Sequence, residues 1–496
     1  MLQKLAGFAR EQMIAVKLGA TPVADAFLMG TVWSDMLGLM LTTALPAALV
    51  PAYVATIQGQ GLSAANHLTR RLFLRLCLVG GLFVAVAQVT IPYWLRPLIA
   101  AWPPDLIRLA EGAAWWSLLQ VPLFGVAGLL RSALNARDEY IYSPLGTTAQ
   151  NVVNALLAFW FAQVPLQLVK LQLIGFAMPG LVALIPLVWL YRSQPVPAVE
   201  VTRKKKSPPL TSVLPFIIWS TLGFAYLPIE RFFSAVLPGG STAALTFADR
   251  LRQFALQTVV LSIVTVGYPA LAEASARTDW ARFRALLDRG IRYVFLLALP
   301  AAAGLTALRE LLVQALFQWG VFDQQGTVMT ASVLSGYAAG IPLLAINALL
   351  AHAIFALGRP WIPVLGLAAG VLTQAAISAA FVGGRGGWVL SWAGAAAALV
   401  PLLIQLWALG ATLEIRLLEQ VGHWARENWQ PALASMVMGV LCWGLAGFVP
   451  SFAERTLQVI STVVICGFGV GVYVAGLWYF GVPEVSTGLK RLLRRS

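Results

Sequence analysis

Charged and amide side chains interrupt one of the most apolar parts of the sequence. In TFADRLRQFALQTV, residues 246–259, Asp249, Arg250, Arg252 and Gln253 fall together within about two helical turns. The flanking segments are apolar. An ionisable group at the centre of a bilayer costs at least about 2.5–3.5 kcal/mol, so it normally faces a partner or a water-filled cavity. The stretch is therefore a candidate binding segment.

A second group of polar residues lies near the N-terminus. Gln3, Arg10 and Lys17 recur every seven residues and would share one face of a helix. If both cationic segments face a cleft between two helical bundles, phosphates are the expected ligands, because arginine binds phosphate oxygens in bidentate fashion. The candidate substrate-binding residues are Lys4, Arg10, Asp25, Arg250, Arg252 and Gln253.

A structural role is the alternative for each of these residues. Asp249 and Arg252 stand at positions i and i+3, a spacing that allows a structural ion pair on one helix. Cationic side chains near helix ends can also extend to the lipid headgroups.

Catalytic and metal-binding patterns are missing from the sequence. There is no GxSxG, HExxH, CxxC or P-loop motif, and the three cysteines and three histidines are scattered. We therefore expect no catalytic residues, no metal and no cofactor, and a protein that is not an enzyme.

Composition places the chain in a membrane. Of its 496 residues, 59% are hydrophobic and 11% are charged, and the mean hydropathy is +0.78. So few charges cannot cover a soluble protein of this length. A window of about twenty residues predicts an all-α polytopic protein with about fourteen transmembrane helices. The windows are 2–20, 26–55, 72–98, 110–135, 143–165, 168–191, 211–236, 243–272, 290–316, 328–356, 361–383, 387–411, 430–449 and 456–481.

The basic residues predict the orientation of the chain. They gather in alternate loops, including RKKK at 203–206, and in the tail KRLLRRS. Cytoplasmic loops carry the excess of Lys and Arg, so both termini are expected to be cytoplasmic. This distribution explains the net charge of +14 by topology and anionic lipid headgroups, and we expect no nucleic-acid partner.

An internal repeat is indicated by prolines at nearly constant separation. Three pairs lie 218 to 220 residues apart, namely Pro51 and Pro269, Pro122 and Pro342, and Pro144 and Pro363. Duplicated bundles with a substrate site between them are a common transporter plan. The predicted domains are a six-helix bundle over 1–192, a basic, proline-containing cytoplasmic linker over 193–209, a second six-helix bundle over 210–411, and two additional helices with a basic tail over 412–496.

Three segments carry a resemblance to a known family. LAGFAREQMIAVKLGATPVADAF (5–27), ALTFADRLRQF (244–254) and ALNARDEYIYSPLGTTAQNVVN (133–154) resemble the first-helix, eighth-helix and fifth-helix motifs of the MurJ/MviN lipid II flippases. These belong to the multidrug/oligosaccharidyl-lipid/polysaccharide exporter superfamily. The likeness extends over essentially the whole chain.

The resemblance implies an alternating-access flippase of the bacterial inner membrane. Its substrate would be an undecaprenyl-pyrophosphate-linked glycan, lipid II or a related lipid-linked saccharide, moved from the inner to the outer leaflet for cell-wall synthesis. Arg10, Asp25 and Arg250 stand where family members keep functionally important charges. Membrane lipids and envelope-synthesis enzymes are the implied partners, and the membrane potential or a monovalent ion is the implied driving force.

The sequence departs from the family pattern at four positions. Lys4 stands in place of the usual arginine, Gly38 and Leu39 stand in place of an Arg-Arg pair, and Gln253 replaces a glutamate. Two other functions stay open. A cation-coupled drug or metabolite antiporter of the same superfamily would use an acidic residue in the cavity, and the lost Arg pair is compatible with a non-transporting envelope scaffold.

Overall fold

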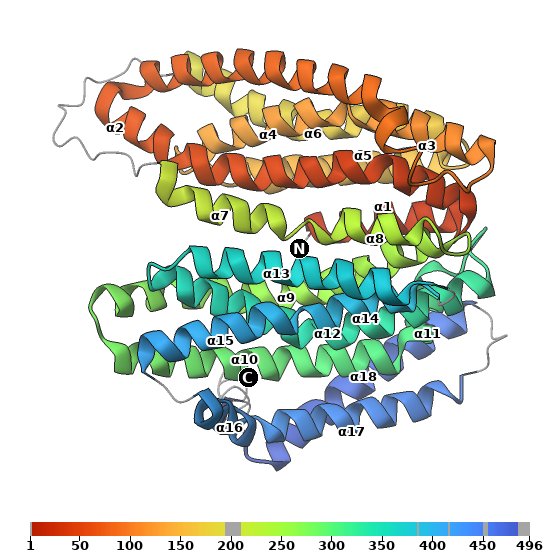
Figure 1. Ribbon diagram of the computed structural model, residues 1–496, viewed down its shortest axis with the longest axis vertical. Coiled ribbons are helices and arrows are strands. Elements are labelled where there is room, and N and C mark those ends of the chain that lie inside the picture. Colours follow the sequence, from red (N-terminus) through yellow and green to blue (C-terminus); the bar gives the residue numbers. More distant parts are fainter. Residues whose placement is uncertain (1, 194–209, 384–385, 415–416, 450–454, 485–496) are drawn as a thin grey trace. The chain divides into compact units, whose positions relative to one another are not determined.

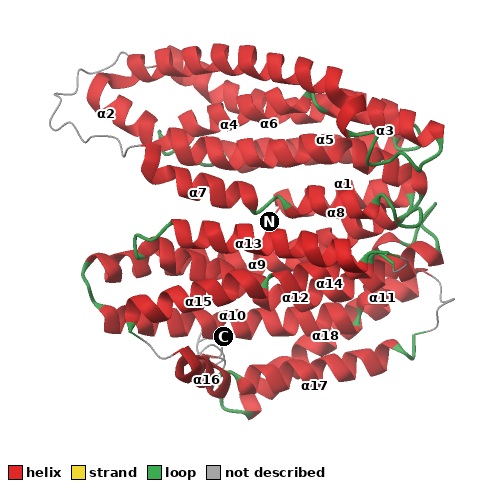
Figure 2. Ribbon diagram, viewed as in Figure 1, coloured by secondary structure: helices red, strands yellow, loops and turns green. Residues whose placement is uncertain are grey.

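Helices form every regular element in the part of the chain that the structure describes. The computed structural model describes residues 2–193, 210–383, 386–414, 417–449 and 455–484, and no strand occurs in these ranges (Figure 2). Most of the predicted linker and the basic tail lie outside the described residues. The all-α class predicted from composition is confirmed.

The chain divides into two compact units. The first contains residues 1–243 together with 320–322, and the second contains the remainder. The helices of the first unit are α1 (Leu2–Leu18), α2 (Pro22–Trp94), α3 (Pro104–Ser117), α4 (Gln120–Asn135), α5 (Tyr142–Phe161), α6 (Pro165–Ser193), α7 (Leu210–Leu222) and α8 (Tyr226–Ser234).

The second unit contains nearly all of α9 and every later helix. These are α9 (Ser241–Ala276), α10 (Trp280–Ala307), α11 (Arg309–Phe317), α12 (Gln324–Ala356), α13 (Trp361–Phe381), α14 (Trp388–Ala397), α15 (Leu399–Leu413), α16 (Leu417–Glu427), α17 (Trp429–Ala446) and α18 (Arg455–Tyr479).

Local sequence sets where several helices begin. The Thr21 hydroxyl caps α2 by accepting a hydrogen bond from the Ala24 amide at 3.3 Å, and Pro22 follows at the first helical position. Asp279 and Asp323 cap α10 and α12 in the same way. These residue types are preferred at such positions because they satisfy amides that lack a partner within the helix.

Helix α2 folds back on itself at Gly61. That residue has φ of 81° and ψ of 176°, a conformation open essentially to glycine alone. The two arms of α2 enclose α4 (Figure 1). Tyr53 from the first arm and Ala65 from the second are buried together with Leu129 and Leu134 of α4. The predicted windows 26–55 and 72–98 thus correspond to the two arms of one bent helix.

Two apolar clusters hold the second unit together. One joins α10, α12 and α15, where Phe283, Leu349 and Leu409 are buried. The other packs α17 and α18 against α10 and α11 around Met438 and Leu477. The two C-terminal helices are therefore part of this unit.

The proline repeat has a counterpart in side-chain packing. A buried amide of one helix lies against a glycine of the next in each unit, and a glycine lies against a proline in each. The matched contacts are Asn154 with Gly175, Gln374 with Gly394, Gly146 with Pro179, and Gly366 with Pro401. Equivalent residues are 219 to 222 positions apart. The same helix-packing pattern therefore occurs twice.

The membrane count and domain boundaries stay predictions. Nine helical stretches among the described residues are long and apolar enough to cross a membrane, whereas the sequence windows predict about fourteen. The packing also groups α7 and α8 with the first unit, where they contact α2, whereas the repeat assigns them to the second bundle. Helix α16 was not among the predicted windows.

Candidate functional site

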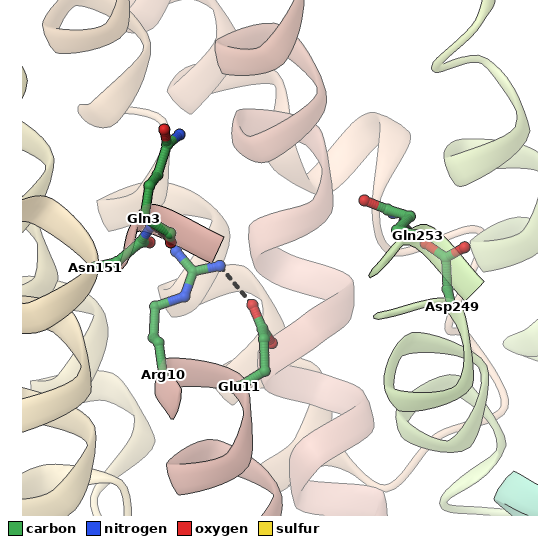
Figure 3. Close-up of polar contacts among 6 residues, drawn as sticks. All are labelled: Gln3, Arg10, Glu11, Asn151, Asp249 and Gln253. Carbon is green, nitrogen blue, oxygen red and sulfur yellow. Dashed lines mark hydrogen bonds and ion pairs between the residues drawn. The ribbon is translucent and has the colours of Figure 1, made fainter. Parts of the chain in front are cut away.

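The first polar cluster lies on α1. Arg10 forms an ion pair with Glu11 (Figure 3), and their side chains are 17% and 5% exposed. Lys4 is partly buried. The Lys17 ammonium lies 5.1 Å from the centre of the Phe159 ring of α5. The cluster therefore keeps an excess of positive charge after its one carboxylate is paired.

Helix α5 supports one end of this cluster. The Asn151 side-chain amide donates to the Gln3 backbone carbonyl at 3.4 Å, and both residues lie at the same end of the cluster in Figure 3. Gly7 also faces the Asn151 side chain, because a Cβ at that position would approach it to 3.3 Å. The α1 cations are thus carried on a helix that packs closely against α5.

Asp25 has a structural contact in the first unit. Its carboxylate accepts hydrogen bonds from the Gly240 amide at 2.6 Å and the Ala243 amide at 2.7 Å, and the residue is 3% exposed. These amides form the start of α9, where a negative charge is favourable. Nearby, Arg231 donates to the Thr242 carbonyl at 2.7 Å. The predicted part of Asp25 in substrate binding stays a prediction.

The second polar cluster lies on α9 and centres on Asp249. The carboxylate accepts from Arg252 Nε at 2.8 Å and from Gln253 Nε2 at 2.5 Å. Asp249 and Arg252 form an ion pair whose side chains are 7% and 11% exposed. The Arg252 guanidinium also lies 4.8 Å from the centre of the Tyr337 ring of α12. Figure 3 shows Asp249 and Gln253 on this helix.

The hydrogen bonds to Asp249 indicate different roles for the polar residues of α9. Arg252 and Gln253 are engaged with the carboxylate, so their first role is to satisfy a buried charge. Arg250 is partly buried on the same helix and gives the cluster of one carboxylate and two guanidiniums a net positive charge. An anionic ligand is the chemistry that this balance favours.

The structure explains one departure from the family pattern. Gly38 is buried against the Phe124 ring of α4, and a Cβ at Gly38 would collide with that ring. An arginine therefore cannot replace Gly38 without displacing Phe124. Leu39, in the other arginine position, is 41% exposed.

Several contacts in these clusters could not be predicted from the sequence. Neighbouring residues such as Arg10 and Glu11 point to different sides of a helix, so their spacing gave no signal for a pair. The Tyr337 and Phe159 contacts join distant parts of the chain. In contrast, the Asp249 and Arg252 pair follows from helical spacing alone. No group of three potential metal ligands occurs among the described residues.

Comparison with protein families gives a match over most of the chain. The family described as lipid II flippase MurJ matches residues 14–464. A probable lipid II flippase MurJ of Rhizobium meliloti (strain 1021) is 26% identical over 351 residues, which cover 68% of this chain and 65% of the relative. The match to a probable lipid II flippase MurJ of Synechocystis covers 100% of this chain and 95% of the relative at 24% identity.

Solved structures show the same fold. A lipid II flippase MurJ in an inward closed conformation superposes with a TM-score of 0.76 at 15% identity, over 96% of this chain and 97% of that one. An inward-facing multidrug resistance MATE family transporter of the MOP superfamily gives a TM-score of 0.69 at 15% identity, over 83% and 95% of the two chains.

Proposed function

The chain belongs to the lipid II flippase MurJ family, and from that membership we propose that it moves lipid II from the inner to the outer leaflet of the bacterial inner membrane. The observation that carries the proposal is the family match over residues 14–464. The chain is a multi-pass membrane protein of a transporter family. It therefore supplies the outer leaflet with a peptidoglycan precursor rather than catalysing a reaction.

The charge of the two clusters supports an anionic headgroup as the ligand. Lipid II carries its glycan on an undecaprenyl pyrophosphate. We assign pyrophosphate binding to the cations of α1, Lys4 and Arg10, and to Arg250 of α9, with Arg252 and Gln253 holding Asp249 beside it. The polyprenyl tail stays in the lipid while the headgroup crosses.

The driving force follows from the charge of the substrate. Moving an anion out of a cell that is negative inside is downhill by about 2.3 kcal/mol per charge per 100 mV. We propose that the membrane potential, or a monovalent ion moving with it, drives or resets the transport cycle. The proposed orientation has both termini in the cytoplasm, where envelope-synthesis enzymes deliver the substrate.

Rescue of bacteria conditionally depleted of their own lipid II flippase tests this function. We expect the wild-type chain to restore growth and Arg250→Glu to fail, because a carboxylate would repel the pyrophosphate. Arg108→Glu is the matched control, since that arginine is 75% exposed and its ion-pair partner is Asp105 on its own helix. Membrane levels of each variant are measured by immunoblotting.

Each other outcome contradicts part of the proposal. Failure of the wild-type chain, present at normal levels, would favour another lipid-linked saccharide or a scaffold. Rescue by Arg250→Glu would remove Arg250 from the transport path. Export of organic cations in exchange for protons or sodium would favour the antiporter.

A further inference from the structure

A groove of about 480 Å³ lies inside the first unit, between the two arms of α2 and helix α4. Its walls are apolar, with Leu45 from the first arm, Val79 and Phe83 from the second, and Pro122 from α4. Among the described residues that form the lining, Arg75 is the one with a charge. The volume is in the range of sites that hold small molecules, and the lining residues include none of those assigned above to pyrophosphate binding.

The outer side of the groove borders a lipid-facing surface. On the second arm of α2, Leu78 and Leu82 are 76% and 67% exposed, and Val79, which also lines the groove, is 64% exposed. Exposed leucine and valine at this density are expected to face hydrocarbon in a protein that spans a membrane. A lipid can therefore enter the groove sideways from the bilayer.

The length of the groove matches one leaflet. Its lining on the second arm runs from Leu72 to Phe83, which is about 16 Å at the rise of an α-helix. Half of the hydrocarbon core of a bilayer is about 15 Å thick. One extended acyl chain thus fits along the groove without leaving its leaflet.

The charged residue of the groove, Arg75, lies near one end of the lining. On the second arm, Leu72 is the lining residue nearest the bend at Gly61, Arg75 lies one helical turn beyond it, and the lining from Leu76 to Phe83 is apolar. Arg71 precedes Arg75 by one turn on the same helical face. No carboxylate is among the described residues that line the groove. A molecule with one anionic end and one long apolar chain is complementary to this arrangement.

We propose that the groove binds an anionic phospholipid of the surrounding membrane. The phosphate contacts the Arg75 guanidinium, and one acyl chain lies between the arms of α2 against α4. The bound lipid fills space that the protein leaves open between these helices. The groove shares no lining residue with the residues assigned to pyrophosphate binding, and phospholipid binding there does not depend on the proposed function.

Native mass spectrometry of the full-length protein tests the proposal. The probes are phosphatidylglycerol and phosphatidylcholine with the same acyl chains. We expect the wild-type protein to retain phosphatidylglycerol preferentially. Arg75→Gln should weaken that retention about fivefold, the usual effect of one cation near an anionic lipid. Arg70→Gln is the matched control, because five residues along a helix place Arg70 on a different face from Arg75.

A second variant tests the acyl chain separately. A Cβ at Gly80 would lie 3.6 Å from Pro122, an ordinary contact, so Gly80→Leu fills the groove without an immediate clash. The Gly80→Leu variant should no longer retain phosphatidylglycerol. A phospholipid with a photoreactive acyl chain should label the peptide that contains Val79 and Phe83 in the wild-type protein but not in this variant. If Gly80→Leu lowers the midpoint of thermal unfolding relative to the wild type, the Val79→Trp variant is used in its place.

Three results would overturn the proposal. Equal retention of the two phospholipids would remove the charge selectivity. An equal loss in Arg70→Gln would indicate a diffuse attraction to the basic end of α2. Preferential retention of a polyprenyl phosphate over phosphatidylglycerol, with the same labelling, would assign the groove to the tail of the transported lipid.

Discussion

At the residue scale, the clearest feature is the satisfaction of one buried carboxylate. Asp249 accepts from both Arg252 and Gln253 on its own helix. Breaking a buried ion pair by removing one partner leaves an uncompensated charge, which typically costs about 3–5 kcal/mol. The α9 cluster thus combines a structural pair with a cation, Arg250, that we assign to the substrate.

We predict that Asp249→Ala lowers the midpoint of thermal unfolding markedly, because Arg252 and Gln253 lose their acceptor. Asp105→Ala is the matched control, since Asp105 and Arg108 form an i,i+3 pair that is 83% and 75% exposed. Exposed pairs contribute about 1 kcal/mol or less. Tryptophan fluorescence during heating measures both variants, and equal shifts would contradict a special role for burial.

Residue spacing predicted part of this site. The helical positions of Asp249 and Arg252 are sufficient to predict their pairing, since both lie on one helix. Gln253 is a predicted substrate-binding residue, and in the structure its amide donates to Asp249; its part in substrate binding stays a prediction. Whether the Gln253 amide donates to the substrate or to the Asp249 carboxylate depends on packing, which one sequence does not specify.

At the element scale, the start of α9 depends on a residue far away in the sequence. Asp25 of α2 accepts from two amides at the beginning of α9. A helix start usually takes this hydrogen bond from its own N-cap residue, but Gly240 has no side chain to supply it. The sequence therefore indicated a charge in a membrane helix without revealing its partner.

We predict that Asp25→Ala loosens the first turn of α9. Each buried amide left without an acceptor costs about 1–3 kcal/mol. Hydrogen exchange should be faster at Ala243 in the variant, and Asp25→Asn should have a smaller effect because one acceptor oxygen remains. Unchanged exchange at the start of α10, which its own Asp279 caps, is the internal control. Unchanged exchange at Ala243 would contradict the capping role.

Two glycines should differ in their tolerance of a side chain. Gly61 and Gly240 have φ of 81° and 92°, so alanine is strained at either position, by roughly 1–3 kcal/mol. A Cβ at Gly61 would meet open space, but one at Gly240 would collide with the Ala20 carbonyl. We predict that Gly240→Ala lowers the unfolding midpoint more than Gly61→Ala. The reverse order would contradict the packing at Gly240.

At the scale of the whole molecule, the sequence predicted the helical membrane fold well. Hydropathy located segments that correspond to helices, and the proline repeat anticipated the matched contacts of Asn154 and Gln374 with glycines. The hydropathy windows did not predict that α2 is one bent helix. The bend depends on the φ angle of Gly61, which is a local backbone property that hydropathy does not report. The amphipathic α16 was also not predicted, because its sequence contains no long apolar stretch.

The positive-inside pattern makes a prediction for topology. In a cysteine-free background, Ser63→Cys near the α2 bend should react with a membrane-impermeant thiol reagent only after the cells are opened. Asp105→Cys at the start of α3 should react in intact cells, because an odd number of membrane crossings separates the two positions. The reverse labelling would contradict a cytoplasmic N-terminus.

The central claim is that the chain moves lipid II to the outer leaflet. Its most direct test is the fraction of lipid II that an externally added lipid II-cleaving enzyme can degrade in cells depleted of their own flippase. We expect the wild-type chain to raise this fraction well above that of the empty vector, and Arg250→Glu to leave it at the vector level. A fraction that stays at the vector level with the wild-type chain present in the membrane would contradict lipid II transport.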